Sequence, residues 1–115
     1  MTGKEYQKLA MRTNDGKCNE RLKEQVDYGI EGEYDFGGLI NACLGLSGEV
    51  GEFNDMIKKW VFHEKSLDEE HLKKEISDIL WYVAMACESM EWDLDEIMQI
   101  NIDRQNGIDT SCRKL

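Results

Sequence analysis

The chain has 115 residues, and its 24 acidic and 14 basic side chains give a formal net charge of −10. This length favours one compact domain, and a strongly negative surface argues against binding to nucleic acid. We find no apolar run long enough to cross a membrane, and the start lacks the apolar core of a signal peptide. We therefore expect a cytoplasmic protein without a membrane partner.

Helix signals begin at the N-terminus, while proline is absent from the whole chain. Thr2 followed by Glu5 fits a capping box, which opens a short helix toward Arg12. Residues 18–27 are compatible with a polar helix. Residues 28–38 are rich in glycine and acids, and we expect a loop there.

The central part of the chain predicts two longer helices. The first begins near residues 36–39 and runs to about Phe62. The second covers about residues 67–90, after a capping box formed by Ser66 and Glu69.

A further helix and a tail complete the chain. Asp93 and Glu96 predict a third capping box before a helix over residues 94–106, which Gly107 closes in the left-handed conformation. Residues 108–115 show no periodicity, and we expect a loose tail.

The helix predicted over residues 67–90 contains a stretch, residues 79–87, that is apolar on every side. Such a helix is surrounded by protein, and one small chain can hardly cover it. We predict an all-α fold, a four- to five-helix bundle over residues 1–107, completed by assembly into a homodimer or homotetramer. The alternative is that this helix lies at the centre of a monomeric bundle.

Two pairs of acidic residues stand three positions apart on the predicted helices. Glu49 and Glu52 form one pair, and Glu75 and Asp78 form the other. Residues three apart share a helix face, so two facing helices would gather four carboxylates. Such spacing also arises by chance in an acidic chain, but the small and apolar residues 44–53 strengthen the argument. Clustered carboxylates repel, and a hard cation such as Mg²⁺ relieves the repulsion.

Residues 48–52 (GEVGE) and 75–82 (EISDILWY) carry a resemblance to a known family. They resemble the E-x-x-E…E-x-x-D signature of the MazG-like all-α nucleoside triphosphate pyrophosphohydrolases. The similarity includes residues 39–46 and 101–104, and it spans roughly residues 5–104.

This resemblance implies cleavage of a nucleoside triphosphate to its monophosphate and pyrophosphate, in the service of cleaning or balancing the nucleotide pool. Glu49, Glu52, Glu75 and Asp78 would be the catalytic residues and would hold Mg²⁺, with Mn²⁺ as a possible substitute. Glu49 is our preferred group for orienting the attacking water.

The substrate contacts are expected from cationic, aromatic and amide side chains near the predicted pocket. Cations would meet the phosphates, aromatic rings would stack on the base, and amides would bind the base edge or the sugar. The candidates are Lys59 (with Lys58), Arg104, Trp60, Tyr82, Asn41 and Asn101. The two asparagines rest on the resemblance alone, and each lysine is equally well explained as a surface charge.

Three other interpretations compete with this one. A ferritin-like di-iron site is disfavoured, because it needs Glu-x-x-His, which does not occur here. A non-catalytic acidic helical interaction module predicts that Glu52 and Asp78 are exposed and that Mg²⁺ changes nothing. Within the enzyme class, the substrate would be a nucleotide-like phosphate ester other than a deoxynucleoside triphosphate.

Overall fold

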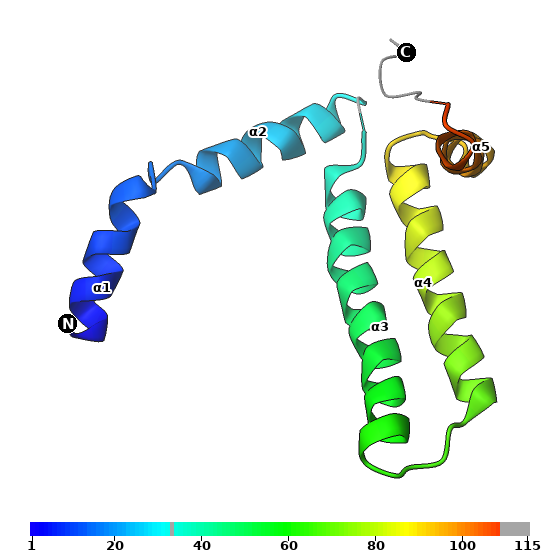
Figure 1. Ribbon diagram of the computed structural model, residues 1–115. Coiled ribbons are helices and arrows are strands. Elements are labelled where there is room, and N and C mark those ends of the chain that lie inside the picture. Colours follow the sequence, from blue (N-terminus) through cyan, green and yellow to red (C-terminus); the bar gives the residue numbers. More distant parts are fainter. Residues whose placement is uncertain (33, 109–115) are drawn as a thin grey trace. The chain divides into compact units, whose positions relative to one another are not determined.

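A computed structural model describes residues 1–32 and 34–108, and the described part of the chain is all-α with no strand. Its elements are α1 (Gly3–Ala10), the short 3₁₀ helix η1 (Met11–Thr13), α2 (Cys18–Ile30), α3 (Phe36–Phe62), α4 (Glu69–Ser89) and α5 (Leu94–Gln105) (Figure 1). The all-α prediction is confirmed.

The helices fall into two compact units, Met1–Tyr34 and Asp35–Leu115. A single domain over residues 1–107 stays a prediction. The expected loose tail, residues 108–115, lies outside the described residues except for Ile108.

The N-terminal unit opens with the predicted capping box. The Thr2 hydroxyl accepts a hydrogen bond from the Glu5 backbone N–H at 3.0 Å, and the Glu5 carboxylate accepts one from the Thr2 N–H at 3.1 Å. The second helix, α2, continues to Ile30, so the loop expected from residue 28 is wrong at its start. The helix ends where Gly32 supplies a left-handed turn, with φ of 91°.

The second unit begins with the long helix α3, whose predicted bounds are confirmed. Asp35 caps it, because its carboxylate accepts a hydrogen bond from the Gly38 N–H at 3.0 Å. Residues 36–38 are therefore helical, and the end of the expected loop is wrong as well.

The two later capping boxes do not form. Asp68 caps α4 by accepting a hydrogen bond from the His71 N–H at 3.1 Å, so the helix begins two residues later than Ser66 predicted. A carboxylate directly before the helix is at least as good a cap as a serine. Asp93 is the cap residue of α5 but its side chain makes no capping hydrogen bond. Gly107 closes α5 with φ of 79°, as predicted.

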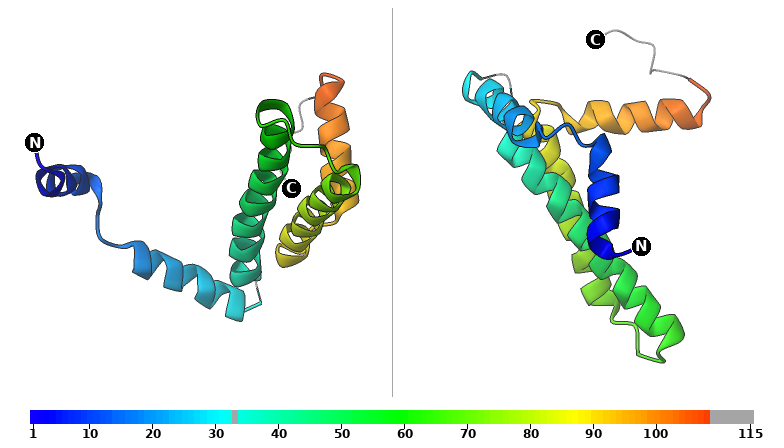
Figure 2. Two further views of the ribbon diagram at one scale, coloured as in Figure 1. Left: turned by 90° about the horizontal axis from the view of Figure 1, so that it is seen from below. Right: turned by 90° about the vertical axis from the view of Figure 1, so that its left-hand side faces the viewer.

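Helices α3 and α4 form an antiparallel hairpin that is the main packing contact of the second unit (Figures 1 and 2). Near its open end, the Asp35 N–H donates a hydrogen bond to the Ser89 carbonyl at 2.8 Å. Further along, Gly45 lies so close to the ring of Tyr82 that a Cβ would overlap it. These two contacts fix the spacing and the register of the hairpin.

The hairpin leaves much of its apolar surface uncovered. Among the described residues, the buried apolar side chains are Ala42 and Cys87, while Leu44, Leu80 and Trp81 are 69%, 59% and 58% exposed. Helix α5 extends away from the end of the hairpin and makes no extensive contact with α3 or α4 (Figure 2). None of the described helices has the length and apolar character that crossing a bilayer requires.

The close approach of Gly45 to Tyr82 gives a stability prediction. Gly45→Ala places a methyl group in the space that the Tyr82 ring occupies. We expect this overlap to lower the free energy of unfolding by about 1–3 kcal/mol. Gly48→Ala is the matched control, since nothing lies within 4 Å of a Cβ there. Alanine should stabilise the helix at that position by about 1 kcal/mol. Urea unfolding measures both, and equal effects at the two positions would contradict this packing.

Candidate metal centre

Three carboxylates from the two hairpin helices converge on one point. Glu49 and Glu52 share a face of α3, and Glu75 projects from α4. One carboxylate oxygen from each lies within 4.8 Å of the others. We call these three residues the glutamate cluster. It forms because Glu49 and Glu52, three residues apart, share the face of α3 that lies opposite Glu75 on the antiparallel helix.

Burial within the cluster is uneven. Glu75 is only 6% exposed, Glu49 is half-buried, and Glu52 is exposed. The Oε2 atoms of Glu49 and Glu75 are buried without any hydrogen-bond partner. Carboxylate oxygens that are withdrawn from water and left unpaired are costly. Hard oxygen donors of this kind suit Mg²⁺ or Mn²⁺, so the residues present fit a divalent cation.

The pKa values of the cluster shift in opposite directions on the two helices. The close approach of the Glu75 carboxylate, followed by burial and the charges of Glu52 and Asp78, raises the pKa of Glu49 to about 7. The pKa of Glu52 is also raised, first by its interaction with Glu75. The pKa of Glu75 is lowered, first by its interaction with Glu49. Negative charge therefore concentrates on the buried acid of α4, and a proton stays on α3.

Asp78, the fourth predicted ligand, lies at the edge of the cluster. Its side chain is exposed, and its carboxylate is not one of the three that meet within 4.8 Å. Its charge nevertheless helps to raise the pKa values of Glu49 and Glu52. The exposure of Glu52 and Asp78 matches the interaction-module alternative, whereas the buried, unpartnered oxygens of Glu49 and Glu75 do not.

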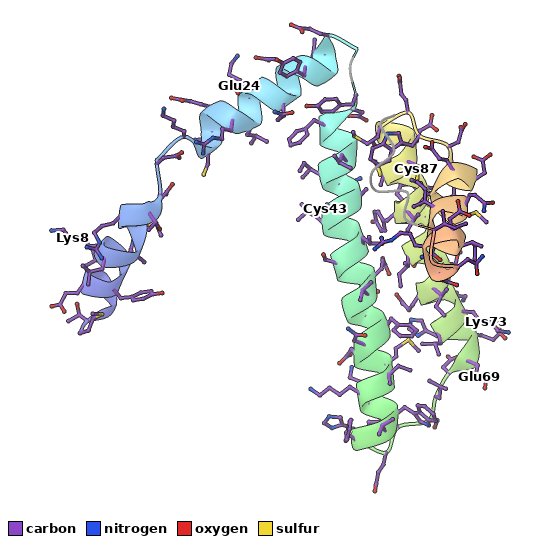
Figure 3. The ribbon with its side chains drawn as sticks, turned by 45° about the horizontal axis from the view of Figure 1, so that its top comes forward. Lys8, Glu24, Cys43, Glu69, Lys73 and Cys87 are labelled. Carbon is purple, nitrogen blue, oxygen red and sulfur yellow. The ribbon has the colours of Figure 1, made fainter. Side chains whose placement is uncertain are left out.

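Ordinary surface acids on α4 look different from the cluster. Glu69 and Lys73 project from the side of α4 that faces away from α3 (Figure 3). Lys73 pairs there with Glu70 at 3.2 Å, and both side chains are more than 70% exposed. Glu70 is thus solvated and paired with a lysine, whereas Glu75 is withdrawn from water.

A histidine outside the predicted set of site residues contacts the cluster. The Nε2 atom of His71 lies 3.0 Å from Oε1 of Glu75, one helical turn along α4. The four-residue spacing of His71 and Glu75 was the signal available in the sequence.

Two of the predicted substrate residues take part in packing. Tyr82 lies against Gly45 and meets the ring of Trp81 edge to face, with centroids 5.0 Å apart. The Asn41 amide donates to Met85 Sδ at 3.4 Å, and so links α3 to α4. Both are on the hairpin, and their roles in substrate binding stay predictions.

The other four are not brought to the cluster. Lys59 pairs with Asp55 at 2.7 Å, and Trp60 is 47% exposed near the end of α3. Asn101 and Arg104 lie on α5, which makes no extensive contact with the hairpin. Within residues 1–32 and 34–108, no hydrogen bond or ion pair joins these four side chains to the three glutamates.

Comparison with known proteins identifies a family that matches this chain. The model of a family described as the MazG nucleotide pyrophosphohydrolase domain matches residues 40–115. The chain is also 28% identical over 71 residues to the Gene 37 protein of Mycobacterium phage L5. That match covers 58% of this chain and 62% of the phage protein, which is less than two thirds of that relative's length. No solved structure gives a significant match.

The raised pKa of Glu49 predicts how stability depends on pH without metal. Folded Glu49 keeps its proton up to about pH 7, whereas the unfolded residue releases it near pH 4.5. The folded state therefore binds more protons in this interval, so stability falls as the pH rises through it. We expect Glu49→Gln to flatten this decline, measured by urea unfolding at several pH values in EDTA. Equal slopes in the two proteins would contradict the assignment.

Proposed function

The chain belongs to the MazG nucleotide pyrophosphohydrolase family, and from that premise we propose that it hydrolyses nucleoside triphosphates to monophosphates and pyrophosphate, using a divalent cation. The observation that carries this proposal is the glutamate cluster with its two buried, unpartnered oxygens. An acidic chain can meet a polyanionic substrate only if cations neutralise both.

The cluster residues have distinct roles in this proposal. Glu49, Glu52 and Glu75 hold Mg²⁺, or Mn²⁺ in its place, and Asp78 adds negative charge at the edge. The bound cation supplies charge stabilisation at the α-phosphate and lowers the pKa of water. Glu49 is the preferred group for orienting the attacking water and accepting its proton.

The substrate contacts are proposed from the predicted residues on the hairpin and on α5. Lys59 can exchange Asp55 for a phosphate at little cost, since exposed ion pairs are weak. Trp60 and Tyr82 offer aromatic faces for the base, and Asn41 offers an amide. Asn101 and Arg104 complete the set. Because they lie on α5, their role requires that α5 of this or another chain lies next to the glutamate cluster.

We also propose that the active form is a homodimer or homotetramer. Leu44, Leu80 and Trp81 leave broad apolar surface on both helices of the hairpin, and covering such surface is the main driving force for association. The proposed setting is the cytoplasm, where the enzyme cleans or balances the nucleotide pool.

The first test is pyrophosphate release across a panel of ribo- and deoxynucleoside triphosphates and modified nucleotides with Mg²⁺. We expect Glu52→Gln to reduce turnover by about 100-fold or more, because losing even an outer partner of a metal ligand typically costs about 10–100-fold. Glu70→Gln, an exposed acid on α4 outside the cluster, should leave turnover unchanged. Turnover that survives Glu52→Gln would remove the metal assignment. Wild-type protein that is inactive on the whole panel would favour the interaction module.

The second test concerns assembly. Light scattering after size-exclusion chromatography should give twice or four times the chain mass of 13.3 kDa. Leu80→Glu should shift the mass toward one chain, since a buried charge at an interface is costly. Leu80→Met keeps the volume and the apolar character, and should preserve the assembly. A single-chain mass for the wild type would overturn the proposal.

A further inference from the structure

Glu75 is the member of the cluster whose two oxygens have different surroundings. The side chain is only 8% exposed, so water solvates it poorly. Its Oε1 atom has the imidazole of His71 at 3.0 Å, whereas its Oε2 atom is buried with no partner. Oε1 of Glu75 is therefore held by a hydrogen bond, and Oε2 is available to a cation.

The position of His71 is set by the helix and does not depend on the cluster. Its backbone N–H is held by the Asp68 cap at 3.1 Å, in the first turn of α4. From there a four-residue spacing brings its ring over Glu75. The imidazole is 55% exposed, so a substitution removes the ring without opening a cavity in the hairpin.

The direction of the hydrogen bond follows from its partners. An ionised carboxylate only accepts, so Nε2 of His71 must carry the proton that it shares with Oε1 of Glu75. With Oε1 held in this way, the carboxylate cannot rotate freely about its last bond. We propose that His71 is a positioning residue that orients Glu75 so that Oε2 faces the cation, an inference that rests on the proposed metal-dependent function.

Two simpler roles fit the contacts less well. A direct metal ligand would be among the groups that converge within 4.8 Å, and His71 is not, while its Nε2 atom already contacts Glu75. As an ordinary surface ion pair, it would have an exposed partner, as the pair of Lys73 with Glu70 does. Hydrogen bonds to metal-ligating carboxylates orient the ligand and tune its affinity for the metal.

The test is Mn²⁺ binding by the full chain, measured by isothermal titration calorimetry without nucleotide. We expect His71→Ala to weaken Mn²⁺ binding by about 10–100-fold. His71→Gln keeps an N–H donor on the same turn and should recover part of the affinity. His63→Ala is the matched control, because His63 ends α3 and has no hydrogen bond to the cluster. It should bind Mn²⁺ as the wild type does.

The outcomes separate this inference from the proposed function. Wild-type protein that binds no Mn²⁺ overturns both. Wild-type binding with equal or tighter binding by His71→Ala overturns the positioning role alone, as does His71→Gln that is no better than His71→Ala. Melting curves in EDTA show whether each variant is folded. A purely structural role would lower the melting temperature but leave the Mn²⁺ affinity of the folded protein unchanged.

Discussion

Mutual repulsion among three carboxylates is the constraint around which the hairpin is organised. Oxygen atoms of Glu49, Glu52 and Glu75 are held within 4.8 Å, and two of the oxygens are buried without partners. Such an arrangement would relax if either helix could slide or tilt. The Tyr82 ring seated on Gly45 and the Asp35–Ser89 hydrogen bond prevent this movement. Rigid helices thus hold in place an acid cluster that is unfavourable without a cation.

The same hairpin explains why a chain of this size is incomplete by itself. Helix α3 places small residues on its packed side, where Ala42 is buried and Gly45 lies against Tyr82 of α4. The large residues Leu44, Leu80 and Trp81 then point elsewhere and remain exposed. Close packing between the helices and broad apolar surface outside them arise from the same distribution of side chains. The glutamate cluster is built inside the hairpin, while the apolar surface lies open to further chains.

Much of this could be predicted from the sequence because helix periodicity is local. The three-residue spacing of Glu49 and Glu52 fixes a common face, and α3 was bounded correctly. Errors arose where two local signals compete, as when Asp68 and not Ser66 capped α4. They also arose where tertiary contacts decide. The exposure of Asp78 depends on how α4 is rotated against α3. The lack of an extensive contact between α5 and the hairpin likewise could not be predicted from the spacing of residues within α5.

The proton that Glu49 retains near neutral pH has a consequence for how the site fills. A cation that binds the cluster needs ionised oxygens, so its arrival must expel that proton. Binding of the cation would then replace the proton on Glu49. The apparent affinity would fall in acid, and uptake in unbuffered solution would release acid. Without a cation, this proton partly neutralises the cluster and lessens the repulsion among its carboxylates.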